Sequence, residues 1–160
     1  MNSLASCLRE LESKISRQEV ISPAVSIASV GWHIEHSLLT LNLIIERLKT
    51  SDAKSYKWTF NFTRILVFTT NKIPRGRAKS PDVVVPKSKF DVDTLTVHIG
   101  VAKARILELD TFQTDNFFEH PYFGKLNLRP TIKFLEIHTQ HHLAIINDIL
   151  KSPPVSLKQV

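Results

Sequence analysis

The sequence predicts a single, mainly helical domain, and three observations support this class. The chain has 160 residues, enough for one sizeable core and too few for two domains of ordinary size. Hydrophobic residues make up 42% and Gly only 4 positions, which argues against a disordered, collagen-like or turn-rich barrel protein. Eight prolines divide the chain into long intervals rich in Leu, Ile and amphipathic charge. We therefore expect one all-α domain over residues 1–160.

Two helices are expected in the first third of the chain. The one over residues 3–16 has apolar residues at spacings of three and four, the pattern of a surface helix with a narrow buried face. These residues are Leu4, Leu8, Leu11 and Ile15. The one over residues 23–49 is apolar on most of its circumference. It should therefore be buried on more than one side and form the centre of the domain.

A third helix is expected over residues 56–71, although its aromatic and β-branched residues also fit a strand. Residues 73–90 contain three prolines, Gly76 and a basic cluster, so they should form a long irregular connection. A connection of this length in a small domain is either mobile or shaped to cover another part of the protein.

The basic charge is concentrated in this connection. Residues 74–89 hold five Lys and Arg against one Asp, which is +4 of the net charge of +6. The cations are Arg75, Arg77, Lys79, Lys87 and Lys89. Binding to a phosphate backbone needs several cations held in register. A basic loop on a nearly balanced body supports this only weakly, so nucleic acid is not the expected partner.

Two helices are expected in the second half. Asp91 is placed to cap the first, over residues 92–112, whose apolar residues again fall on one stripe. Residues 117–130, FFEHPYFGKLNLRP, are expected to form a turn. The last helix should cover residues 130–151, because a proline suits its first turn and two prolines follow its end.

The sequence contains no segment that would span or enter a membrane. The longest stretch without Lys, Arg, Asp or Glu, Val20–Ile34, has 15 residues and includes Pro23, so it is too short to cross a bilayer. The first residues lack the basic-then-apolar order of a signal peptide, and the lone Cys7 permits no intrachain disulfide. We expect a cytoplasmic protein with no membrane partner.

The densest of the seven histidines lie in the last predicted helix, in IHTQHHLAII. At 100° per residue, His138 and His142 fall together at the centre of its apolar stripe, and His141 falls at the margin. Two imidazoles one turn apart can converge on one metal ion. The alternative is a pair of buried histidines satisfied by neighbours, but this stripe offers mostly Ile, Leu and Phe. The pair predicts a metal site that needs a third ligand.

The predicted central helix offers two candidates for that ligand, His33 and His36, in GWHIEHSLL. Because this helix is apolar almost all round, periodicity does not choose between them. His98 stands alone on its helix and is expected to be a surface or satisfied residue. His120 belongs to the HPYFG turn and is expected to be structural, since His138 lies about 12 Å along the last helix.

The segments GWHIEHSLL, IPRGRAKSP, HPYFGKL and IHTQHHLAII resemble those of the DinB/YfiT-like superfamily, in a branch known as a domain of unknown function. The resemblance implies a four-helix bundle of up-down-down-up topology, here with an extra helix and the basic loop in its middle connection. It also implies a homodimer and a divalent metal ion held by His36, His138 and His142. His33 and His141 depart from the family pattern, and each could replace a ligand or serve in proton transfer.

Three neutral imidazoles leave at least one coordination position open, as in catalytic sites. A metal-bound water there would have a pKa near neutrality. No Asp or Glu shares the ligand face of the last helix, and Glu35 points about 100° away from His36. We therefore expect a metal-dependent enzyme of hydrolase type acting on a small molecule, with Zn, Ni, Mn or Fe as the ion.

Three alternatives to a hydrolase stay open at this point. The resemblance also fits a metal-dependent thiol S-transferase. A non-catalytic helical binding module could use the basic 74–89 loop to dock an acidic partner or nucleic acid. A small-molecule sensor could hold the metal without turning anything over. No residue in the sequence identifies the substrate.

Overall fold

The computed structural model describes residues 2–76, 80–87 and 90–152, and it is mostly helical with one small sheet. In these residues the regular elements are α1 (Asn2–Glu12), α2 (Val30–Thr50), α3 (Phe62–Thr70), α4 (Val92–Glu108), β1 (Phe117–His120), β2 (Gly124–Asn127) and α5 (Leu128–Lys151). The expected helical class is confirmed, and the two-stranded sheet is a departure from an all-α fold. Arg77, Lys79 and Lys89 of the basic loop, and the prolines at 153 and 154, lie outside the described residues.

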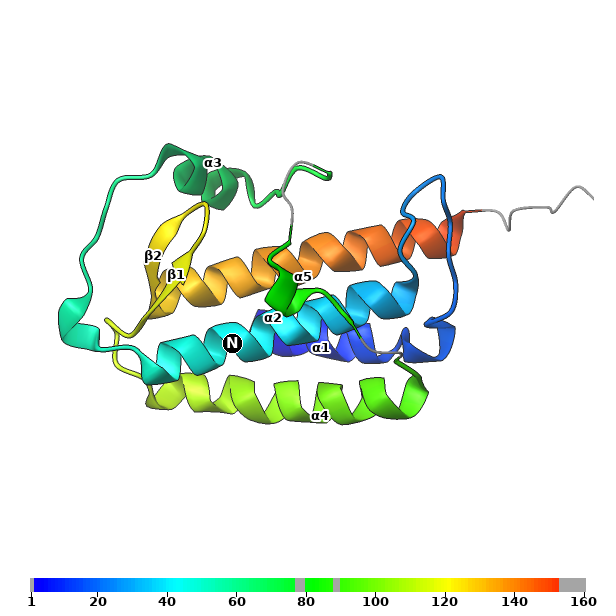
Figure 1. Cartoon of the computed structure of the whole chain (residues 1–160), viewed down its shortest axis with the longest axis horizontal. Coiled ribbons are helices and arrows are strands. Elements are labelled where there is room, and N and C mark those ends of the chain that lie inside the picture. The colour runs from blue at the N-terminus through cyan, green and yellow to red at the C-terminus, as the bar shows by residue number, and fades with distance from the viewer. Residues whose placement is uncertain (1, 77–79, 88–89, 153–160) are drawn as a thin grey trace, which may run out of the picture.

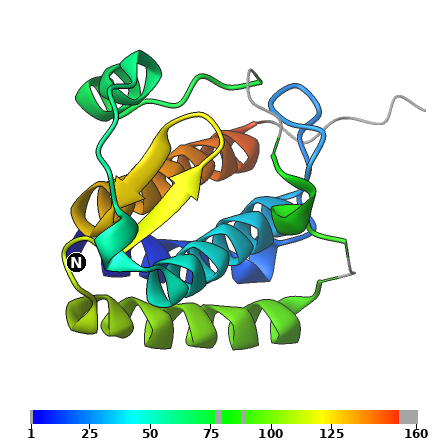
Figure 2. The ribbon, with the colours of Figure 1, turned by 60° about the vertical axis from the view of Figure 1, so that its left-hand side comes forward.

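Four helices, α1, α2, α4 and α5, lie side by side along their lengths (Figures 1 and 2). Each of α2 and α1 contacts both α4 and α5, and the apolar faces of all four meet in one core. The colours of Figure 1 show that α1 and α5 run in one direction and α2 and α4 in the other. As predicted, α2 is central, because its side chains are buried against both α4 and α5. None of the helices within the described residues is long and apolar enough to cross a membrane.

The helix boundaries follow capping side chains. The hydroxyl of Ser29 accepts a hydrogen bond from the backbone N–H of Trp32, so α2 begins at Val30 and not near Pro23 as expected. The carboxylate of Asp91 accepts from the N–H of Thr94 and caps α4, which confirms that prediction. The third helix is shorter than expected, because the side chain of Asn61 caps it only from Phe62 onward.

The segment expected to be a turn forms a β-hairpin instead. β1 and β2 pair antiparallel, with Phe117 opposite Asn127 and His120 opposite Gly124. The three residues between the strands fit a short hairpin loop, and Gly124 takes the positive φ of 67° that such loops require. Leu126 is buried under the sheet, so the hairpin closes one end of the core.

Residues 73–76 and 80–87, which we call the strap, cross over α2 and α5 (Figure 1). Their only helical part is a single turn, Asp82–Val84, which packs on α2. Val84 is buried, whereas Val83 is exposed. The described part of the predicted irregular connection therefore covers another part of the protein, which was one of its two expected roles.

Candidate metal centre

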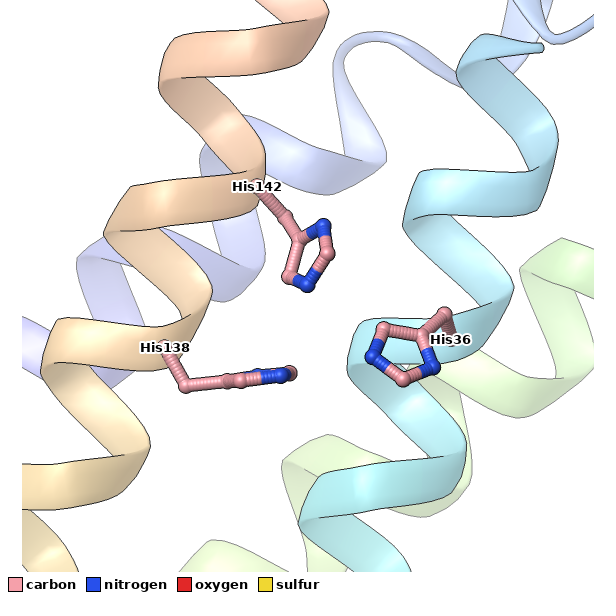
Figure 3. Close-up of side chains that lie close together, drawn as sticks. All are labelled: His36, His138 and His142. Atoms are coloured by element: carbon pink, nitrogen blue, oxygen red, sulfur yellow. The ribbon is translucent and has the colours of Figure 1, made fainter. Parts of the chain in front are cut away.

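Three histidine side chains meet between α2 and α5. His36 comes from α2, and His138 and His142 come from successive turns of α5; Figure 3 shows their rings turned toward one shared space. One nitrogen from each ring lies within 4.8 Å of the other two. The ring centroids of His138 and His142 are 4.6 Å apart, and that of His36 is 5.2 and 4.8 Å from them. The three predicted ligands are thus close enough to hold one metal ion.

His36 is held by two contacts that fix its ring. Its Nδ1 lies 2.7 Å from the backbone oxygen of Val84 in the strap. Because a carbonyl oxygen can only accept, Nδ1 carries the proton and Nε2 keeps its lone pair. The indole of Trp32 stacks on the ring at 5.0 Å with an interplanar angle of 11°. His36 is therefore oriented as a neutral ligand through Nε2.

His142 is held by a chain of two hydrogen bonds. Its Nδ1 lies 3.0 Å from Nδ1 of His33, whose Nε2 lies 3.0 Å from the hydroxyl oxygen of Ser26. That oxygen also accepts from the N–H of Ala28. When His142 donates to His33 and His33 donates to Ser26, each nitrogen in the chain has its partner and Nε2 of His142 keeps its lone pair. The residue left open by periodicity, His33, is thus the neighbour of a ligand.

His138 has no hydrogen bond to any of the described residues. Its ring lies 5.7 Å from that of Phe134, one turn earlier on α5, and it faces the cavity described below. Its nitrogens are therefore free of protein partners on the side where His36 and His142 converge.

Burial keeps the three rings neutral. Desolvation lowers the pKa of His36, and it lowers the pKa of His138 and His142 well below the usual histidine range. The neighbouring imidazoles lower the pKa of His138 and His142 further, because each disfavours a positive charge on the next. Burial likewise lowers the pKa of His33 to about 4. A neutral imidazole is the form that binds a metal ion, so this environment suits a ligand set.

Within the described residues, no carboxylate joins this histidine group. Glu35 is next to His36 in sequence but lies on another face of α2, where its carboxylate accepts a hydrogen bond of 2.8 Å from Nδ1 of His98 on α4. The expected direction of Glu35 and the expectation that His98 is a satisfied residue are both confirmed. The donor set is three neutral nitrogens, which fits a divalent transition metal or zinc and not calcium or magnesium.

The histidine group opens into a cavity of about 190 Å³. Its walls come from α2, α5, the hairpin and the strap, and they are largely apolar. Besides the three histidines they include Thr40, Leu43, Ile44, Ile73, Pro74, Gly76, Ser80, Pro81, Val84, Phe118, His120, Pro121, Tyr122, Phe123, Phe134 and His141. The cavity leaves room beside the three rings for a small molecule.

Two further histidines line this cavity, and neither belongs to the three-histidine group. His120, expected to be structural, stacks on Phe123 with ring centroids 4.2 Å apart. Its Nδ1 accepts from the N–H of Tyr122, so its Nε2 carries the proton, and burial lowers its pKa to about 4. His141 occupies the margin of the α5 stripe, as its helical phase predicted. The sequence did not show that the hairpin would bring His120 to the cavity.

Comparisons of the chain with family models, with curated proteins and with solved structures find no match.

Proposed function

We propose that the protein is a metal-dependent enzyme of hydrolase type, in which His36, His138 and His142 hold one divalent ion. One observation supports this above all: three neutral imidazoles from two helices converge at the wall of a largely apolar cavity. A structural metal site is closed by four protein ligands, whereas three ligands beside a cavity leave a position for a reactant. When bound, such an ion would act as a Lewis acid that polarises a substrate carbonyl and lowers the pKa of a water molecule.

The residues around the centre have separable roles in this proposal. The carbonyl of Val84 and the ring of His33 hold two ligands in the tautomer that exposes Nε2. The strap and the hairpin supply walls of the cavity beside the centre. His120 offers an N–H to an acceptor oxygen of a substrate, because its Nδ1 already accepts from Tyr122. The apolar walls favour a small, largely apolar substrate.

We also propose membership of the DinB/YfiT-like superfamily, with its up-down-down-up bundle and its homodimer. The directions of the four long helices support this, since α1 and α5 run opposite to α2 and α4 (Figure 1). The position of α3 and the strap between α2 and α4 supports an extra helix and a loop in the middle connection.

The binding module that docks through its basic loop has less support. Arg75, one of the loop cations, lies 2.8 Å from the carboxylate of Asp148 on α5. Residues before and after it in the strap line the cavity. The described part of the loop thus faces the protein as much as the solvent.

Metal analysis of the purified protein tests the proposal. We expect close to one equivalent of Zn, Ni, Mn or Fe, and loss of most of it in His138→Ala and in His142→Ala. His98→Ala is the matched control, because His98 is bonded to Glu35 outside the centre, and it should keep its metal. Hydrolysis of small aryl esters and amides by the loaded protein should be lost in the same two variants.

Two results would contradict the proposal. Variants that keep both their metal content and their thermal stability would show that these histidines hold no ion. A loaded protein that joins low-molecular-weight thiols to electrophiles but hydrolyses no ester or amide would be an S-transferase and not a hydrolase.

A further inference from the structure

The short helix α3 packs Val67 and part of Phe68 against the core, but it leaves most of its apolar side chains exposed. Its buried residues are Arg64 and Val67, whereas Phe62, Ile65 and Leu66 are exposed. A surface helix normally buries its apolar side chains and exposes its charged ones. The outer face of α3 is therefore an apolar surface that the fold presents to its surroundings.

Hydrogen bonds of Arg64 explain why this side chain faces the protein while apolar residues of α3 face outward. The guanidinium donates to the backbone oxygens of Phe123 and Lys125 in the hairpin and to that of Thr59. It also lies against the ring of Trp58, 5.5 Å from its centroid. These charge-assisted hydrogen bonds fix the inner face of α3 against the hairpin. The apolar side chains on the outer face of α3 can therefore stay exposed without changing how the helix is oriented.

The apolar surface continues into the extended segment before α3. Trp58 is 64% exposed, Phe60 69% and Phe62 70%. With Ile65 and Leu66 they form what we call the α3 patch. Figures 1 and 2 show α3 at the edge of the bundle, above the hairpin, where it also contacts α5, and the side chains of the α3 patch are all exposed. Contiguous apolar surface rich in aromatic rings marks a site of contact.

The chain segment that carries the α3 patch has charges of one sign. The sequence contains no Asp or Glu between Asp52 and Asp82. Lys54, Lys57 and Lys72, which flank the patch in sequence, are all exposed. The partner that this surface fits is therefore apolar in its interior and anionic at its boundary.

We propose that the α3 patch docks on an anionic lipid surface, with Trp58, Phe60 and Phe62 at the level of the headgroups and the flanking lysines on the phosphates. Aromatic side chains favour that level of a bilayer, and basic residues beside them bind anionic lipids. A symmetric contact between two copies of the chain would bring two surfaces flanked by lysines of the same charge together. Nucleic acid would gain nothing from the aliphatic side chains of Ile65 and Leu66.

This contact needs no membrane-spanning segment, so it revises the expectation that the protein has no membrane partner. That expectation depended on the absence of a span. The docking is also independent of the metal centre, because none of the patch residues lines the cavity.

Sedimentation of the full chain with lipid vesicles tests the proposal. We expect binding to phosphatidylcholine vesicles that contain about 30% phosphatidylglycerol, and little binding to phosphatidylcholine alone. Raising the NaCl concentration from about 50 to about 300 mM should weaken binding by about tenfold or more, because the Debye length shortens. Trp58 fluorescence should shift to shorter wavelength on binding.

Two double variants and a control locate the surface. Phe60→Ser with Phe62→Ser removes two aromatic anchors, and Lys57→Glu with Lys72→Glu reverses two charges; each should reduce binding by about tenfold or more. Val97→Ser with Val101→Ser changes two exposed valines on α4 and should bind as the parent does. All six residues are exposed, so thermal unfolding should confirm that the variants fold.

Several outcomes would overturn the proposal. Vesicle binding that is equal with and without phosphatidylglycerol, or that is unchanged in both double variants, would show that the α3 patch is not the lipid-binding surface. A dimer in sedimentation velocity that dissociates in the aromatic variant, with no vesicle binding, would identify a second copy as the occupant. Binding of single-stranded DNA in place of vesicles would assign the basic residues to nucleic acid.

Discussion

The two sides of α2 contact histidines with different partners. On the side toward α5, His36 meets His138 and His142 with no carboxylate among the described residues nearby. On the side toward α4, Glu35 accepts a hydrogen bond from His98. Adjacent residues of one helix thus serve two different clusters.

The difference shows what makes a buried imidazole available to a metal. In the first cluster the Nδ1 atoms of His36 and His142 face a neutral carbonyl and a neutral ring, and burial keeps the rings uncharged. In the second, the nitrogen that faces inward is already bonded to an anion. Burial without a carboxylate keeps an imidazole neutral, with one nitrogen lone pair for an outside partner, whereas a neighbouring carboxylate favours the protonated ring, which has no lone pair to offer.

The largest effect is expected when the hydrogen bond between His33 and His142, in the first cluster, is removed. His33→Phe keeps the ring volume but removes the acceptor for Nδ1 of His142, so the metal affinity should fall by about 10- to 100-fold. His33→Gln, which can still accept and donate, should recover part of the loss. Competition titration with a chelating dye measures both constants.

Glu35→Gln is the matched control for that experiment, because it weakens the contact on the other side of α2. It should leave the metal affinity within about twofold. Equal losses in His33→Phe and Glu35→Gln would mean that the two sides of the helix are not independent.

An effect of intermediate size concerns the pH dependence of stability. Burial lowers the pKa of His120 from 6.5 to about 4. Because the unfolded chain then takes up the proton first as the pH falls, the stabilisation is complete above about pH 6.5 and is lost toward pH 4. Between pH 7 and pH 5 the free energy of unfolding of His120→Phe should gain about 2 kcal/mol relative to the parent.

Urea unfolding at several pH values measures this difference without metal. The parent and the variant share every other histidine, so their difference isolates one ring. A difference that does not change with pH would mean that His120 titrates alike in the folded and unfolded chain.

The last comparison concerns two glycines outside the centre, and the smaller of its two effects is the smallest expected. A Cβ at Gly31 would lie 2.5 Å from the ring of Phe90, which lines a second cavity, on the α4 side of α2, together with Glu35 and His98. Gly31→Ala should therefore cost about 1–3 kcal/mol of stability. Gly100, on α4, has open space around it, so Gly100→Ala should stabilise by about 0.5–1 kcal/mol. Thermal unfolding measures both, and a destabilised Gly100→Ala would contradict the packing described here.

Much of the centre could be predicted because its three candidate ligands lie on regular helices. Helical phase placed His138 and His142 together and put His141 at the margin, and the structure agrees. Phase could not separate His36 from His33, because α2 is apolar on most sides. That choice depends on which ring faces α5 directly and which lies behind His142.

Other features depend on contacts distant in sequence and could not be predicted. The carbonyl of Val84 reaches His36 from 48 residues away, and the hairpin brings His120 to the cavity wall. Some local signals were present but were outweighed. Ser29, three residues before Trp32, is a cap signal, but Pro23 is an equally good start for a helix. Gly124, which begins β2 with a positive φ, fits a hairpin as well as a turn.

The strap covers the cavity and also supports the centre. Its residue Val84 lines the cavity, and the backbone oxygen of Val84 accepts a hydrogen bond from His36. Lifting the strap to admit a molecule would free the imidazole to rotate at the same moment. The position of this one backbone carbonyl therefore couples the covering of the cavity to the orientation of the His36 ring.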